Sequence, residues 1–293
     1  MTKTPLVTIG LPVYNSERYL ANSLDSLLAQ TYRDFVLIIS DNASTDGTTE
    51  ICRKYVAADD RVKYFRNDAN IGNPRNFNRV FELAQTKYLK WSTADDFWGP
   101  TFLEAALEVM EREPDIALCY PQAFLVDSDG SNPKPYNDTL HLMDDAPEQR
   151  FLSLLRRIKL AHQHLGLVRM SCLRATHLLG TQVGSDITLL AELTLYGKFY
   201  ELPQRLFYRR FHEKSGSWKR GDAKHEAALY YGTNDRMRLK QWRTHMGLFA
   251  AVHRAPLSAA ARWRLYGYLA RRMGWDAAEL SHELLAFAQS VIR

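Results

Sequence analysis

The sequence has few cysteines and none of the long apolar runs that cross membranes. Its three cysteines, Cys52, Cys119 and Cys172, are odd in number and widely spaced, which fits neither a disulfide framework nor a zinc ribbon. No run of about 18 apolar residues occurs, and residues 1–5 lack the apolar core of a signal peptide. We therefore expect reduced cysteines and a cytoplasmic protein, with a peripheral position at the inner face of the membrane as an alternative.

Three common nucleotide and metal motifs are also missing. The sequence contains no G-x-G-x-x-G, no G-x-x-x-x-G-K-[ST] and no H-E-x-x-H. These patterns mark the dinucleotide-binding turn, the P-loop and the zinc-protease helix. Their absence argues against a dehydrogenase, a P-loop phosphotransferase and a zincin.

What is present is an ordinary globular composition with an uneven charge. Hydrophobic residues make up 46% and charged residues 24% of the 293 residues, which is enough for a sizeable core. Residues 222–293 hold 11 Lys/Arg and 6 Asp/Glu, and this difference equals the whole net charge of +5. Such a basic tail is typical of a solvated helical face, a surface for anionic lipid headgroups, a helical cap or a homodimer contact. We expect no nucleic-acid partner.

Apolar segments of strand length alternate with segments of helical period. The expected strands are residues 5–13, 35–40, 62–66, 88–92, 116–120 and 204–208, and the expected helices are 15–28, 48–57, 74–85, 102–111, 151–158 and 188–196. Asn15 or Ser16 can cap the first helix. Beyond Gly221 the sequence reads as helix, with breaks near Pro256 and Gly274. Strict alternation predicts an α/β fold with a mostly parallel sheet flanked by helices.

Polar residues follow four of the expected strands. They are Tyr14-Asn15, Asp41-Asn42, Asn67-Asp68 and Asp95-Asp96. In a parallel sheet the carboxyl ends of the strands meet at one edge, where ligands bind. We expect these four pairs to line one crevice.

Two adjacent carboxylates, Asp95 and Asp96, follow the strand at 88–92. A short acidic turn supplies the oxygen ligands that a divalent cation bridging a diphosphate requires. Because neighbouring residues point to opposite faces, only one of the two is expected to touch the metal, and we favour Asp96. The alternative is that one of them caps the helix that begins near Pro100.

Asp41 ends the second strand, and Tyr14 follows the first. A carboxylate at this place can accept a hydrogen bond from a pyrimidine N–H, while the tyrosine ring can stack on the same base. Taken alone, Asp41 and Asn42 fit an Asx-turn equally well, and Tyr14 fits an ordinary edge aromatic.

These pieces, in this order, resemble the family 2 glycosyltransferases with the GT-A fold, over roughly residues 5–217. The segments that carry the resemblance are VTIGLPVYN at 7–15, SLLAQTY at 26–32, DNASTDGT at 41–48, NIG at 70–72 with Asn78 and Ala84, TADD at 93–96, GSD at 184–186 and YRRFHEKS at 208–215. Two positions depart from the family. Thr93 stands where many members have an Asp, which leaves open which acid binds metal, and Phe77 stands where they often have Arg.

The resemblance implies a site for a nucleotide-sugar and a divalent metal, Mn²⁺ or Mg²⁺. It places the donor nucleotide against Pro12, Tyr14, Asn15, Asp41, Asn70, Asn78 and Asp95, the metal at Asp96 and His212, and the diphosphate at Arg209 and Ser215. It also implies a Rossmann-like GT-A domain over residues 1–221, with a donor-binding half at about 1–121 and an acceptor half at about 122–221. We expect residues 222–293 to form a helical C-terminal extension.

Inverting transfer needs a general base that removes the proton of the acceptor hydroxyl. The resemblance assigns this role to Asp186 in GSD, whose alternative is to cap the following helix. We expect transfer from a UDP-sugar to a glycan or lipid-linked acceptor in bacterial surface-polysaccharide synthesis. The alternatives are a metal-dependent nucleotidyltransferase and a non-catalytic nucleotide-sugar-binding module.

Overall fold

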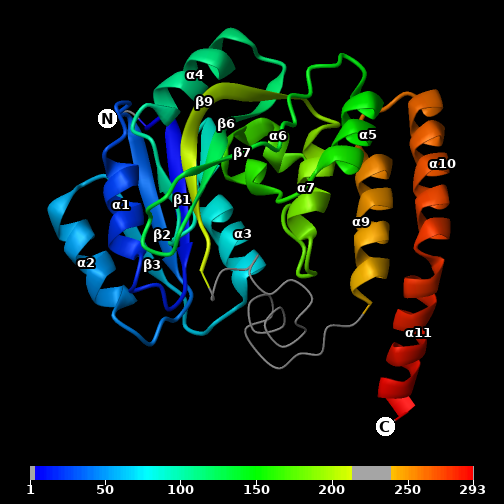
Figure 1. Ribbon diagram of the computed structural model, residues 1–293, viewed down its shortest axis with the longest axis horizontal. Coiled ribbons are helices and arrows are strands. Elements are labelled where there is room, and N and C mark those ends of the chain that lie inside the picture. Colours follow the sequence, from blue (N-terminus) through cyan, green and yellow to red (C-terminus); the bar gives the residue numbers. More distant parts are fainter. Residues whose placement is uncertain (1–3, 213–238, 293) are drawn as a thin grey trace.

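The computed structural model describes residues 4–212 and 239–292, and it has the expected α/β architecture (Figure 1). Within these residues a nine-stranded sheet runs in the order β3-β2-β1-β4-β8-β6-β9-β5, with β7 paired to β6. Helices cover the sheet, and three further helices stand at the C-terminal side. The prediction of an α/β fold with C-terminal helices is therefore confirmed.

The first half of the sheet is parallel, as predicted. It consists of β1 (Val7–Val13), β2 (Phe35–Asp41), β3 (Val62–Arg66) and β4 (Tyr88–Trp91), connected by α1 (Leu20–Leu28), α2 (Thr48–Ala58) and α3 (Asn73–Leu83). All seven residues of β1 are buried, because β1 lies between β2 and β4 and its faces are covered. The carboxyl ends of β1 and β2 lie level, with Val13 paired to Asp41.

The second half is mixed and less regular than the sequence predicts. It contains β5 (Phe97–Trp98), α4 (Phe102–Arg112), β6 (Ile116–Val126), β7 (Lys134–Tyr136), β8 (Leu167–Arg169) and β9 (Lys198–Arg210). The two expected strands at 116–120 and 204–208 are in fact 11 and 13 residues long. The strands β5, β7 and β8 were not predicted, because segments of two or three residues show no periodicity.

The remaining helices of this half surround the far end of the sheet. They are α5 (Pro147–Arg157), the short 3₁₀ helix η1 (His162–Leu165), α6 (Met170–Arg174) and α7 (Ser185–Leu193). The extension consists of α9 (Lys240–Arg254), α10 (Ala259–Trp275) and α11 (Ala277–Ile292), so both predicted breaks are confirmed. The predicted domain boundary at residue 221 lies outside the described residues and stays a prediction.

The predicted cap of the first helix is wrong, and the two alternative helix caps do not occur. The helix α1 begins at Leu20, after Tyr19, so neither Asn15 nor Ser16 caps it. The helix α4 follows Thr101 rather than an aspartate. The helix α7 follows Gly184, whose φ of 83° favours glycine, and Asp186 lies inside its first turn. Asp95, Asp96 and Asp186 are thus not used as helix caps.

None of the helices in the described part of the chain is both long and apolar enough to cross a membrane.

Candidate active site

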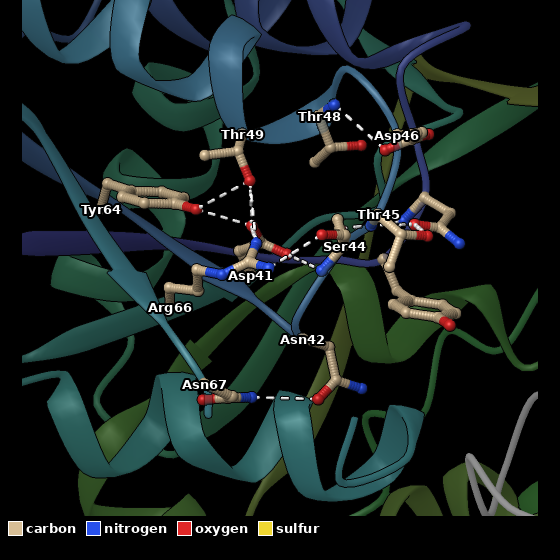
Figure 2. Close-up of polar contacts among 12 residues, drawn as sticks. Asp41, Asn42, Ser44, Thr45, Asp46, Thr48, Thr49, Tyr64, Arg66 and Asn67 are labelled. Carbon is tan, nitrogen blue, oxygen red and sulfur yellow. Dashed lines mark hydrogen bonds and ion pairs between the residues drawn. The ribbon is translucent and has the colours of Figure 1, made fainter. Parts of the chain in front are cut away.

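Asp41, the last residue of β2, has a completely buried carboxylate that four protein groups bond (Figure 2). Its Oδ1 accepts the backbone N–H of Ser44 at 2.8 Å. Its Oδ2 accepts the hydroxyl of Tyr64 at 2.6 Å, the hydroxyl of Thr49 at 3.0 Å and the guanidinium of Arg66 at 2.8 Å. The local bond to Ser44 confirms turn chemistry at this strand end, and the other three donors come from α2 and β3.

These bonds keep Asp41 ionised. Burial opposes ionisation, but the hydrogen bonds from Ser44, Tyr64 and Thr49 outweigh it and hold the pKa of Asp41 below its usual value. Three donors occupy Oδ2, whereas Oδ1 accepts one bond and has a lone pair to spare. Because Asp41 is 0% exposed, a ligand reaches this oxygen only when a covering group shifts.

Hydrogen bonds connect the loops after β1 and β2 beside Asp41. The side-chain oxygen of Asn15 accepts the backbone N–H of Thr45 at 2.8 Å. The backbone N–H of Asn15 donates to the Ser44 hydroxyl at 3.0 Å. Asn15 has a φ of 48°, a left-handed conformation that asparagine tolerates better than most residues. The neighbouring ring of Tyr14 is 45% exposed and is available for stacking.

A second set of amides joins the ends of β2 and β3. Asn67 donates to the Asn42 carbonyl oxygen at 3.0 Å, and Asn42 donates to Asn70 at 2.7 Å. Asn70 also accepts the N–H of Gly72 at 2.9 Å, so its amide shapes the loop that precedes α3. Pro12 is buried within β1. Donor contacts from Pro12 and Asn70 stay predictions.

Asn78 has a clear structural use instead. On α3, its amide donates to the carbonyl of Leu179 at 2.8 Å and accepts the N–H of Leu179 at 3.2 Å. Both bonds tie α3 to the segment that leads into α7. Asn78 thus has a structural role in this chain, and its contact with the donor stays a prediction.

The acidic turn between β4 and β5 treats its two aspartates differently. Asp96 is 5% exposed, and both of its oxygens are bonded: Oδ2 accepts the Thr93 hydroxyl at 2.6 Å and Oδ1 accepts the backbone N–H of Arg210 at 2.8 Å. The side chain of Asp95 is 29% exposed, and its Oδ2 lies 3.0 Å from Nε2 of His212. The more accessible carboxylate is therefore Asp95, which the resemblance had left to the nucleotide.

The electrostatics of the turn separate the pair further. Burial and the charge of Asp95 raise the pKa of Asp96 to about 7, against the opposing charge of Arg209. Burial also works against Asp95, but the hydrogen bond and charge of His212 hold the pKa of Asp95 below its usual value. Lys90 is fully buried on β4, with Nζ 3.4 Å from the centre of the Trp98 ring. Burial lowers the pKa of Lys90 well below its usual value, while the charge of Asp96 opposes that lowering.

Arg210, the last residue of β9, holds this turn in place. Its Nε donates to the carbonyl of Asp95 at 2.8 Å, and its two terminal nitrogens donate to Asn22 on α1 and to the carbonyl of Ser128. The guanidinium also lies 4.7 Å from the centre of the Tyr19 ring. One side chain thus connects α1, the acidic turn and the loop after β6. Sequence analysis named only Arg209 from this pair, although both precede His212.

The residues of the turn fit a cation that arrives together with a ligand. Asp95 Oδ2 and His212 Nε2 lie 3.0 Å apart and come from segments 117 residues apart. Within residues 4–212 and 239–292, no group of three or more His, Cys, Asp or Glu could hold a metal ion by itself. A hard cation takes six or more ligands, so two protein ligands would leave places for diphosphate oxygens and water.

Asp186, the predicted base, comes from the second half of the chain. It is half-buried in the first turn of α7, and α7 packs against η1, which carries His164. Burial lowers the pKa of His164 and the nearby charge of Asp186 raises it, while Arg209 acts on both His164 and Asp96. A shared site for Asp96 and Asp186 stays a prediction. Ser215 lies outside the described residues.

Several residues of the site carry no signal that we recognised in the sequence. These are Thr49, Tyr64, Arg66, Lys90 and Arg210. Arg66 ends a strand in the same way as the four polar pairs, and that position could have identified it. Lys90 stood out only as a lysine within an apolar strand.

Comparison with known proteins agrees with this architecture. Residues 8–175 match Glycosyl transferase family 2. An uncharacterized glycosyltransferase of Methanocaldococcus jannaschii is 33% identical over 129 residues, which are 43% of this chain and 44% of that protein. The putative teichuronic acid biosynthesis glycosyltransferase TuaG of Bacillus subtilis is 29% identical over 182 residues, 60% of this chain and 70% of TuaG. This chain thus spans less than half of the first relative.

Two solved structures share the fold at low sequence identity. S. aureus TarS 1–349 in complex with UDP-GlcNAc has a TM-score of 0.68 and 17% identity, covering 91% of this chain and 72% of that one. The mannosyltransferase PcManGT from Pyrobaculum calidifontis, in complex with GDP-Man and Mn²⁺, has a TM-score of 0.54 and 16% identity, covering 100% of this chain and 82% of that one. The family match spans more than half of the 293 residues. The chain therefore belongs to glycosyltransferase family 2.

Proposed function

We propose that this protein transfers a sugar, with inversion, from a UDP-sugar to a glycan or lipid-linked acceptor and needs a divalent cation to do so. The observation that carries the proposal is the contact between Asp95 and His212 at 3.0 Å. It joins an exposed carboxylate and an imidazole beside a second, buried acid. These side chains could bind a cation that also contacts the diphosphate of the donor.

We assign direct metal contact to Asp95 and His212, and not to the favoured Asp96. Both oxygens of Asp96 already accept protein hydrogen bonds, whereas Asp95 is partly exposed. When bound, Mn²⁺ or Mg²⁺ would neutralise the charge that develops on the leaving diphosphate. Asp96 would then hold the turn through Thr93 and the backbone of Arg210. Arg209 would add positive charge on the diphosphate side.

Asp186 is the proposed general base. Its carboxylate would take the proton of the acceptor hydroxyl while that oxygen bonds to the anomeric carbon and the bond to the diphosphate breaks. UDP leaves with the electrons of that bond. Its Oδ1 accepts the backbone N–H of Ile187 at 2.9 Å, and we assign the proton transfer to Oδ2. The nearby His164 would help to set the charge of the acceptor pocket.

The donor nucleotide is proposed to lie along the ends of β1 and β2. The exposed ring of Tyr14 would stack on the base, and the spare lone pair on Asp41 Oδ1 would accept a pyrimidine N–H. This preference for UDP agrees with TarS, whose complex contains UDP-GlcNAc. A role in bacterial surface-polysaccharide synthesis agrees with TuaG, which is named for teichuronic acid biosynthesis.

Calorimetric titration of UDP, with and without Mn²⁺, tests the metal assignment without an acceptor. We expect Mn²⁺ to strengthen UDP binding in the wild type and in Asp96→Asn, and to have little effect in Asp95→Asn. Asp60→Asn, at an exposed position two residues after α2, is the matched control. Retained stimulation in Asp95→Asn together with its loss in Asp96→Asn would return the ligand role to Asp96.

A product assay distinguishes the rival functions. With a UDP-sugar, Mn²⁺ and a suitable acceptor, a glycosyltransferase releases UDP and no pyrophosphate. Pyrophosphate release would indicate a nucleotidyltransferase. Tight UDP-sugar binding without turnover across a panel of acceptors would indicate a binding module.

A further inference from the structure

The outer face of α10 carries two tryptophans that the rest of the protein leaves in solvent. Trp263 is 73% exposed and Trp275 is 70% exposed, although tryptophan is usually well covered. The exposed positions of this helix follow a helical stripe: Trp263, Arg264, Gly267, Ala270, Arg271, Gly274 and Trp275. The two rings are 12 residues apart in sequence, so they stand about 18 Å apart along the helix. We call this stripe the Trp-Arg face.

Basic residues lie on α10, whereas the acidic residues that follow it contact another helix. The helix α10 contains four arginines and no acidic residue. The acidic residues just beyond it point to α9 instead: Asp276 bonds His245 at 3.0 Å, and Glu283 accepts the backbone N–H of Gln241 at 2.9 Å. Glu148 on α5 pairs with Arg264 at 3.4 Å. Arg271, the other arginine of the face, has no acidic partner within residues 4–212 and 239–292.

The neighbouring helix continues this exposed apolar surface. In Figure 1, α10 and α11 form one column along the edge of the molecule, with α9 between them and the sheet domain. Leu280 is the buried contact of α11, whereas Leu285 is 64% exposed and Leu284 is 45% exposed. The helix that follows α10 in this column therefore adds exposed apolar side chains of its own.

We propose that the Trp-Arg face binds an anionic lipid surface. Indole rings prefer the boundary between headgroups and acyl chains, and arginines bind the phosphates at the same depth. A second copy of this chain fits less well, because a two-fold contact would set arginines against arginines with no acid on α10 to pair with them. The surface is distinct from the acidic turn and does not depend on sugar transfer.

Membrane binding at this face would also orient the acceptor half. The helix α9 packs on α7, which carries Asp186, and α10 packs on both α9 and α5. The lipid surface and Asp186 would then be linked through two layers of packed helices.

Vesicle sedimentation with the full-length chain tests the proposal. We expect binding to phosphatidylcholine vesicles that contain phosphatidylglycerol, weak binding to phosphatidylcholine alone, and weaker binding at high salt. Arg264→Glu/Arg271→Glu should weaken binding at least about tenfold, because each basic residue near the surface contributes about 1 kcal/mol. Trp263→Ala/Trp275→Ala should also weaken it about tenfold and abolish a blue shift of tryptophan fluorescence.

Matched controls separate this effect from charge and folding. Lys54→Glu/Lys63→Glu makes the same change of charge at exposed positions near α2 and should bind vesicles as the wild type does. All variants should keep the wild-type circular dichroism and UDP affinity. The proposal is overturned if the wild type ignores anionic vesicles or if both α10 variants bind like the wild type. It is also overturned if light scattering shows a dimer that Trp263→Ala/Trp275→Ala dissociates.

Discussion

Asp41 at the end of β2 and Asp96 after β4 are buried to a similar degree, at 0% and 5% exposure, yet their pKa values move in opposite directions. Asp41 receives four hydrogen bonds, one of them from the cationic Arg66. Asp96 receives two and lies beside a second carboxylate, Asp95. Burial alone therefore does not decide the charge of an acid, because the number of donors and the sign of the neighbours do.

The carboxylate at the end of β2 is stabilised by protein donors, whereas the two carboxylates of the acidic turn are not fully neutralised by the protein. The β2 end is electrostatically complete within the protein, so it can be preorganised before any ligand arrives. The acidic turn has two carboxylates and too few protein donors, so it gains from added positive charge. We infer that the first site recognises and the second one reacts.

The largest expected effect lies outside both sites, at Asp186. Asp186→Asn should lower turnover by about 10²-fold or more, because a positioned base is lost. UDP affinity with Mn²⁺ should stay near the wild-type value, since neither strand-end acid is touched. Steady-state kinetics and calorimetry give the two numbers. Unchanged turnover would remove Asp186 from the role of base and move the search to the acidic turn.

Replacing Asp41 or Asp96 by asparagine should change the free energy of unfolding differently at the two sites. Asp41→Asn should lower the free energy of unfolding by about 2 kcal/mol, because charged and neutral donors lose their acceptor. Asp96→Asn should leave stability unchanged or raise it at pH 8, where an ionised Asp96 is costly beside Asp95. Urea unfolding followed by circular dichroism measures both. A larger loss in Asp96→Asn would reverse the comparison.

The pH dependence of stability should carry the signature of Asp41. Its pKa is lowered in the folded state, so its contribution is present above the unfolded pKa of about 3.9 and is lost as pH falls through the folded value. Acid unfolding of the wild type should thus be steeper below about pH 4 than that of Asp41→Asn. Urea midpoints measured from pH 5 downward provide the check. Parallel curves would show that the carboxylate is not stabilised by its donors.

The smallest predicted effect concerns a single donor. Tyr64→Phe removes one of three bonds to Asp41 Oδ2 and should cost about 1 kcal/mol, since the remaining donors keep the carboxylate satisfied. Phe65→Ala, at the next position and 37% exposed, is a control for lost packing at β3. Thermal unfolding resolves a difference of this size. An unchanged stability of Tyr64→Phe would mean that the hydroxyl itself contributes nothing.

The first half of the fold was predictable because its elements are long and regular. The periodic leucines of α1 and the apolar run of β2 predict a parallel sheet. The parallel sheet in turn predicts that polar residues meet at its strand ends. The caps failed at Asn15 and Asp96 because tertiary contacts use these side chains instead. Local capping preferences are weaker than such long-range bonds.

The second half was harder for a different reason. β8 has three residues and sits between β4 and β6, so only its neighbours define it. The choice between Asp95 and Asp96 depends on a partner 114 or more residues away, which no local pattern contains. The family resemblance located the acidic turn in the sequence. The choice between Asp95 and Asp96 as the metal ligand required the hydrogen bonds and exposure seen in the structure.

The strand β9 has a consequence for the order in which this protein can mature. It supplies the backbone N–H that Asp96 accepts, the Arg210 side chain that braces the turn, and the approach to His212. During translation the acidic turn leaves the ribosome more than a hundred residues before these partners. A nascent chain can complete the β2 end early, whereas the acidic turn acquires its shape only when β9 has docked.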